Sequence, residues 1–201
     1  MRILFFLEAL GGGGIERVTI TLSKEYLLMG HQVGIVLVEK KGDLLDEIPE
    51  ECGVYELGNA RMPHLIFCLS KILKNYSPDL LIACSWPYTA VAIIAKKLSN
   101  VSLKLLVTEH TDFRLARRFT KKDHFILKNF GRYIYSYADM VAGVSKGVVE
   151  SVSEVTGYSV DDMRVLYNPV RVMNPMIRDN KYDSLLQWWK EKKSESYRLA
   201  L

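Results

Sequence analysis

An apolar run followed by four glycines constrains the fold of this chain most strongly. Residues 2–7 (RILFFL) have the composition of a buried strand, and Gly11 to Gly14 follow three residues later. From Ile15 to Met29, apolar side chains recur every three or four residues. This change of period predicts a strand, then a glycine turn, then a helix.

The glycine turn is a candidate anion-binding loop. Glycine permits a positive φ and a close approach of a ligand to the main chain, and the first N–H groups of the following helix point over the turn. The turn matches no standard nucleotide fingerprint, because Glu16 stands where G-x-G-x-x-G needs its third glycine and no Gly-Lys-Ser/Thr is present. Two interpretations remain open, a loop that binds a phosphate or diphosphate and a simple glycine-capped turn.

Six further apolar segments alternate with segments of helical spacing. The predicted strands are 31–38, 54–57, 80–84, 103–108, 139–144 and 163–166. The predicted helices are 62–75, 88–97, a basic helical region at 114–137, and a helix that follows Ser145 and ends near Thr156. Strands that are apolar throughout and alternate with helices predict an α/β fold, a Rossmann-like parallel β-sheet with helices on both faces.

Polar residues after the strand ends define the expected site. Parallel sheets bind ligands beyond the carboxyl ends of their strands. The glycine turn, Ser85 and the pair Glu109 and His110 all follow predicted strands, so we expect them on one edge. Ser85 and Ser145 are also ordinary helix N-caps, so Ser85 is a secondary candidate.

Composition narrows the class of protein. The chain has 201 residues, enough for one sizeable domain, and a net charge of +4. Its three cysteines form no CxxC pair, which disfavours a disulfide framework or zinc site and favours a reducing compartment. Glu8 interrupts the first apolar stretch, which is too short for the core of a signal peptide. No apolar run approaches the ~20 residues of a membrane span. We therefore expect a cytoplasmic protein.

The excess positive charge is local. Residues 114–132 hold seven basic residues against Asp123 alone, and a helical break is expected near 120–123. The apolar residues expected opposite the basic face are Ala116, Phe119, Leu127, Phe130 and Ile134. Three interpretations are a solvated helix face, a surface for anionic lipid and a nucleic-acid site, the last without an aromatic-interleaved motif to support it. The candidate membrane-binding residues are Arg114, Arg117, Arg118, Lys121 and Lys122.

Four motifs in the right order resemble glycosyltransferase family 4. The run GGGGIERV (11–18) resembles that family's Gly-Gly-x-Glu-Arg-Val loop. Residues 132–151 (RYIYSYADMVAGVSKGVVES) resemble its tyrosine-alanine-aspartate strand, and 164–170 (RVLYNPV) resemble the Asn-Pro/Gly-Val that ends its N-terminal half. The sequence TEH at 108–110 matches the position of its active-site histidine.

The resemblance implies roles for individual residues. His110 would be catalytic, lying against the transferred sugar and hydrogen-bonding one of its hydroxyls. The glycines that would let the loop lie against the substrates are Gly12, Gly13 and Gly14. Glu16 would lie near the acceptor or the diphosphate, or would only offset the helix dipole. Ser85 and Glu109 are further substrate-binding candidates.

The resemblance also implies an activity and a domain plan. The family has the GT-B architecture of two Rossmann-like halves and transfers a sugar, with retention, from a nucleotide sugar to a glycan or lipid-linked acceptor, without a metal or other cofactor. We expect 1–173 to be the acceptor half, and 174–201 to be a linker helix (181–193) and the start of a donor half. The family's donor-side E-x7-E pair is absent from residues 174–201. The alternatives are an accessory subunit that binds acceptor or partners a separate donor subunit, and a nucleotide-sugar epimerase, which the GGGGIERV loop disfavours.

Overall fold

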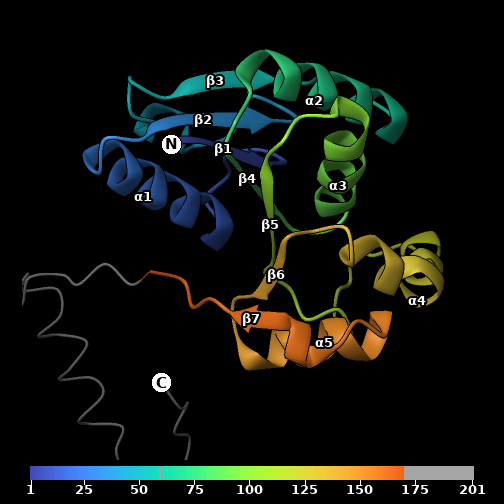
Figure 1. The fold of residues 1–201 in the computed structure, drawn as a ribbon. Coiled ribbons are helices and arrows are strands. Elements are labelled where there is room, and N and C mark those ends of the chain that lie inside the picture. The colour runs from blue at the N-terminus through green and yellow to red at the C-terminus, as the bar shows by residue number, and fades with distance from the viewer. Residues whose placement is uncertain (59, 170–201) are drawn as a thin grey trace, which may run out of the picture. The chain divides into compact units, whose positions relative to one another are not determined.

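A computed structural model describes residues 1–58 and 60–169 (Figure 1). Seven parallel strands form one sheet in the order β3-β2-β1-β4-β5-β6-β7. The strands are β1 Arg2–Leu7, β2 Gln32–Leu37, β3 Gly53–Glu56, β4 Leu80–Cys84, β5 Lys104–Glu109, β6 Met140–Gly143 and β7 Met163–Val165. The helices are α1 Gly14–Leu28, α2 Met62–Tyr76, α3 Tyr88–Ser99, α4 Lys121–Tyr135 and α5 Lys146–Thr156, with 3-10 turns at Leu45–Glu47 and Val160–Asp162.

The structure confirms the predicted parallel α/β fold. Each strand and helix predicted before residue 170 is present, most with bounds within two residues of the prediction. The predicted domain boundary at 173, the helix at 181–193 and the segment after it lie outside the described residues.

The helices divide unequally between the two faces of the sheet. Parallel crossovers are right-handed, so a chain that first moves from β1 to β2 and later from β4 towards β7 places its helices on opposite faces. Helices α2, α3, α4 and α5 pack in one core with Leu4, Phe6 and Val107, whereas α1 packs in a second core with Phe5 and Ile35 (Figure 1). Among the described residues, no helix covers β5, β6 and β7 on the α1 side.

The basic region forms a loop followed by a shorter helix. Helix α4 begins at Lys121, because Thr120 and Asp123 form a capping box in which each side chain bonds the other's backbone N–H. The expected break near 120–123 is therefore confirmed, whereas a helix from 114 is wrong. Phe130 was expected on the buried side of this region but is 52% exposed. No helix in the described part of the chain is long and apolar enough to cross a bilayer.

Candidate functional site

The glycine loop joins β1 to α1 at the carboxyl edge of the sheet. Gly12, Gly13 and Gly14 are exposed, and none of them adopts a positive φ. The absence of a side chain matters here because it leaves room around the loop. A Cβ on Gly13 would collide with the carboxylate of Glu16, which folds back over the loop, whereas the space beside Gly12 and Gly14 is open. The loop therefore presents bare backbone and the start of α1 to the edge of the sheet.

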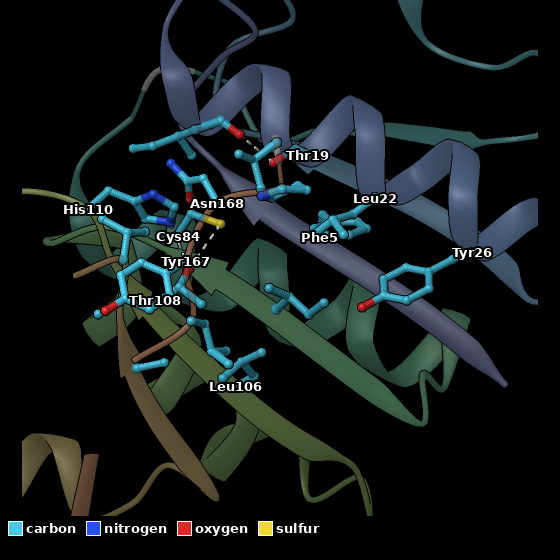
Figure 2. A pocket seen from close by; sticks show the side chains of 18 residues that line it. Phe5, Thr19, Leu22, Tyr26, Cys84, Leu106, Thr108, His110, Tyr167 and Asn168 are labelled. Atoms are coloured by element: carbon cyan, nitrogen blue, oxygen red, sulfur yellow. Dashed lines mark hydrogen bonds between the residues drawn. The ribbon is translucent and has the colours of Figure 1, made fainter. Parts of the chain in front are cut away.

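His110 follows β5 and lies at a cleft on the uncovered part of the sheet (Figure 2). Its Nε2 lies 3.2 Å from Oγ1 of Thr108, whose hydroxyl also lies 3.3 Å from the carbonyl oxygen of Ala83. Burial lowers the pKa of His110 from 6.5 to about 4. The imidazole is therefore neutral at physiological pH.

The cleft beside His110 has a volume of about 270 Å³ and a mainly apolar lining. Phe5, Leu22 and Leu106 line it from β1, α1 and β5, and Asn168 reaches it from the segment after β7 (Figure 2). This places residues of the GGGGIERV, TEH and YNPV motifs around one cavity, although they lie far apart in the sequence. The arrangement suits a ligand that is partly apolar and presents a polar group to the imidazole.

Glu109 lies on the opposite side of the sheet from its neighbour His110, because successive strand residues alternate in direction. It is 1% exposed, and its carboxylate accepts hydrogen bonds from the Trp86 N–H (3.0 Å), the Thr89 hydroxyl (3.0 Å) and the Tyr135 hydroxyl (2.8 Å). The prediction that Glu109 contacts substrate is therefore wrong, and the role of this carboxylate is structural. Glu109 ties β5 to the start of α3 and to α4, and burial raises its pKa to about 7.

Ser85 lies between β4 and α3 in an unusual backbone conformation. Its φ of 63° is in the left-handed region, which residues other than glycine seldom adopt. It is not the N-cap of α3, since Pro87 occupies that position, whereas Ser145 caps α5 as predicted by accepting from the Val148 N–H. Ser85 lines a small hollow together with Glu8, Glu16 and other residues from the carboxyl edge.

The candidate membrane-binding residues separate into two groups. Arg114 forms ion pairs with Asp112 (2.6 Å) and Glu154 (3.3 Å), which fix its guanidinium against the protein. The other four are exposed and form no ion pair with described residues: Arg117, Arg118, Lys121 and Lys122. Two of these, Lys121 and Lys122, begin α4, where positive charge opposes the helix dipole.

Three residues around the site were not identified from the sequence. Thr108 contacts the His110 ring, and its position two residues before His110, at the end of β5, was the available signal. Glu8 follows β1 just as Ser85 follows β4, so the rule that selected Ser85 also selects Glu8. Tyr88, which lines the same hollow, carried no signal because it lies within a predicted helix.

Comparisons with known proteins identify relatives in sequence and in fold. One relative, from Campylobacter jejuni, is N-acetylgalactosamine-N,N'-diacetylbacillosaminyl-diphospho-undecaprenol 4-alpha-N-acetylgalactosaminyltransferase, which is 24% identical over 180 residues, or 84% of this chain and 48% of that protein. A glycosyltransferase from Rickettsia africae has a similar fold, with a TM-score of 0.68, 21% identity and coverage of 94% of this chain and 49% of its own.

Two further solved structures share the fold. The lipopolysaccharide outer core galactosyltransferase WaaB has a TM-score of 0.67 at 22% identity, covering 87% of this chain and 47% of its own. HepE of Anabaena, solved in complex with UDP-glucose, has a TM-score of 0.66 at 18% identity, covering 96% and 50%. The chain thus spans about half the length of the relatives that it matches.

The family match extends over most of the chain. The sequence pattern of Glycosyltransferase Family 4 matches residues 12–173, a range that includes the glycine loop, His110 and the segment after β7. The resemblance noted in the four motifs is thereby confirmed, and this chain belongs to Glycosyltransferase Family 4.

Proposed function

We propose that this chain is the acceptor-side half of a retaining glycosyltransferase, which moves a sugar from a nucleotide sugar to a glycan or lipid-linked acceptor without a metal or other cofactor. The observation that carries this proposal is the neutral His110 at a cleft on the carboxyl edge of a family-4 sheet. The nucleotide sugar and the acceptor are its substrates, and nucleic acid is not.

The environment of His110 suits a sugar hydroxyl. The Thr108 hydroxyl can donate to the Ala83 carbonyl and accept from Nε2–H, which favours the Nε2–H tautomer of His110. Nδ1 then keeps a lone pair that can accept from a hydroxyl. In such a transfer the diphosphate leaves as an anion, and the N–H groups at the start of α1, on the open side of the loop beside Gly12 and Gly14, offer stabilisation of that charge.

The similar proteins support the substrate classes. The name of the Campylobacter relative specifies a diphospho-undecaprenol acceptor, and HepE has been solved with UDP-glucose. We infer a lipid-linked or glycan acceptor for the present protein and a donor of the same chemical class, a nucleotide sugar.

Residues 1–201 alone are expected to bind a nucleotide sugar weakly and to transfer no sugar, because they span only about half the length of the relatives. We propose that a second, donor-side half holds most of the nucleotide. Adding such a half, on the same polypeptide or as a separate chain, should restore transfer to a lipid-linked acceptor in a radiolabelled-sugar assay. Turnover by the purified 201-residue chain would refute this division of labour.

The same reconstitution tests the alternative role. An accessory subunit would hold acceptor or recruit a donor subunit without contributing reacting groups. If the reconstituted protein transfers sugar and the His110→Ala variant transfers it equally well, the accessory role is favoured. The dependence of turnover on His110 therefore separates the two functions.

We further propose that the chain docks reversibly on the cytoplasmic face of an anionic membrane. Helix α4, which carries Lys121 and Lys122, also carries three exposed aromatic side chains: Phe125, Phe130 and Tyr133. Aromatic and basic side chains together are typical of helices that lie in the membrane interface. Arg114 is expected to contribute least, because Asp112 and Glu154 already pair with it.

Removing the four cations that form no ion pair among the described residues should abolish this docking. Each basic residue near an anionic surface contributes about 1 kcal/mol, and this attraction falls off within a Debye length. The variant changes these residues together to glutamine: Arg117, Arg118, Lys121 and Lys122. Co-sedimentation with phosphatidylserine vesicles at low salt should drop sharply for this variant, and salt should have the same effect on the parent.

A matched control removes the same charge elsewhere. Four exposed cations from other elements are changed to glutamine in the control: Lys24, Lys71, Lys74 and Arg164. This variant should still co-sediment with anionic vesicles, and neither protein should bind neutral ones. A parent that ignores anionic vesicles at low salt, or a control that loses binding equally, shows that the basic residues form a solvated face only.

A further inference from the structure

The strand order creates a crevice between β1 and β4. The chain runs outward from β1 to β2 and β3, then returns past β1 to β4 and continues to β7. Connections from β1 and β4 therefore leave in opposite directions, and in such sheets the ligand crevice opens between the carboxyl ends of these two strands. This switch point is distinct from the apolar cleft beside His110, which lies over the face of the sheet.

A small hollow lined by both polar and apolar residues occupies the switch point. Its lining includes Glu8 after β1, Ser85 after β4, Glu16 from the first turn of α1, and Tyr88 and Arg118. The hollow has a volume of about 30 Å³, which exceeds the roughly 10–15 Å³ that one water molecule needs. It can therefore admit one hydroxyl group, but not a whole sugar ring.

Ser85 is the residue that points to a ligand. It is 4% exposed, and its Oγ is buried without a hydrogen-bond partner in the described part of the chain. A buried hydroxyl left without a partner costs free energy, and so does a left-handed φ at a residue other than glycine. Both costs are found at one residue of the expected site, and a ligand hydroxyl in the hollow would offset the first.

The charges around the hollow select against anions. Glu8 and Glu16 supply two carboxylates, and Arg118 supplies one positive charge. Burial and the nearby Glu8 carboxylate raise the pKa of Tyr88, so its phenol stays protonated and remains a hydrogen-bond donor. Carboxylates accept hydrogen bonds from sugar hydroxyls, whereas they repel phosphate.

We propose that this hollow is a subsite for one hydroxyl group of an uncharged sugar, held by Ser85 and the Glu8 and Glu16 carboxylates. That the sugar belongs to the acceptor rests on the proposed function. The subsite is expected to favour neutral sugars over sugar phosphates at the acceptor position.

The test measures sugar binding to the whole 201-residue chain by saturation-transfer NMR. The probes are methyl N-acetyl-α-galactosaminide, which is neutral, and galactose 1-phosphate, which is anionic. The parent should bind the neutral glycoside more tightly than the phosphate. Ser85→Ala should weaken binding of the glycoside by about fivefold, the loss of one hydrogen bond, and Glu16→Gln should narrow the preference between the two probes.

Ser70→Ala is the matched control. Ser70 is also 4% exposed, but it lies on α2 and its hydroxyl donates to the Phe67 carbonyl. This variant should bind the glycoside like the parent and have a lower Tm. Ser85→Ala should have a Tm no lower than that of the parent, because it removes a buried hydroxyl that has no partner among the described residues.

Two results overturn the subsite. One is a parent that shows no saturation transfer to the glycoside, as expected for a hollow that holds only water, and the other is a Ser85→Ala variant that binds it unchanged. The proposed function is judged separately, by sugar transfer in the complete enzyme. Transfer that persists in Ser85→Ala with an unchanged acceptor KM removes the subsite alone, whereas Ser85-dependent binding in a complete protein without transfer removes the function alone.

Discussion

Raising the pH from 4 to 8 is expected to lower the free energy of unfolding of the parent chain by about 3 kcal/mol relative to Glu109→Gln. Burial raises the pKa of Glu109 from 4.5 to about 7 in the folded chain. The folded state therefore holds this proton more tightly than the unfolded state. Its contribution to stability is complete below pH 4.5 and is lost as the pH rises through 7. A difference of about 2.5 between the two pKa values corresponds to roughly 3 kcal/mol.

Urea unfolding at several pH values, followed by tryptophan fluorescence, measures this difference. The readout is the slope with pH and not the absolute stability, because the NH₂ group of a glutamine can face the Trp86 N–H that now donates to the carboxylate. Other titrating groups are common to both proteins and cancel in the comparison.

Glu150→Gln provides the control, since Glu150 is exposed on α5. This variant should follow the pH dependence of the parent. Parallel curves for Glu109→Gln and the parent would show that the buried carboxyl does not titrate in this range. Tyr135→Phe should steepen the loss of stability with pH, because it removes a hydrogen bond to the charged form of Glu109.

The sequence sufficed for the fold because the fold depends on local periodicity. Apolar runs such as 80–84 separated by helical spacing leave few alternatives to a parallel sheet, and the structure has that sheet. Position along the chain also predicted that the glycine loop, Ser85 and His110 would share one edge.

Predicting the role of Glu109 required attention to the alternation of side chains along its strand. Leu105, Val107 and Glu109 share one parity along β5, and all three are buried towards the helices, whereas Thr108 and His110 share the other parity. Strict alternation therefore contained the signal that Glu109 faces the core. Adjacency to His110 suggested a shared site, but in a strand adjacent residues face opposite sides.

Other features depend on tertiary structure and had no sequence signal. The left-handed backbone of Ser85 and the hollow beside it arise where the ends of β1 and β4 meet, which requires the strand order. The ion pair between Arg114 and Glu154 joins residues 40 positions apart. A count of charges placed Arg114 with the other basic residues. Its ion pairs show instead that it links its own loop to Glu154 on α5.

Replacing His110 by alanine in the complete enzyme is expected to lower kcat about a hundredfold, the usual effect of losing one preorganised hydrogen bond to the transition state. The fold should survive, because His110 is only half-buried and follows the end of β5. Steady-state transfer assays should show the loss mainly in kcat, because we expect this hydrogen bond to strengthen as charge develops on the sugar. The Tm should stay close to that of the parent.

The pH profile gives a second, independent measurement of the same residue. Burial lowers the pKa of His110 to about 4, so its imidazole stays neutral between pH 5 and 8. Activity should therefore show no acid limb near 6.5 from this group and should fall only as the pH approaches 4. His64→Ala, on α2, is the control and should leave turnover unchanged. If the rate of transfer by His110→Ala stays within twofold of the rate of the parent, His110 lies outside the reacting site, and its contact with Thr108 is only structural.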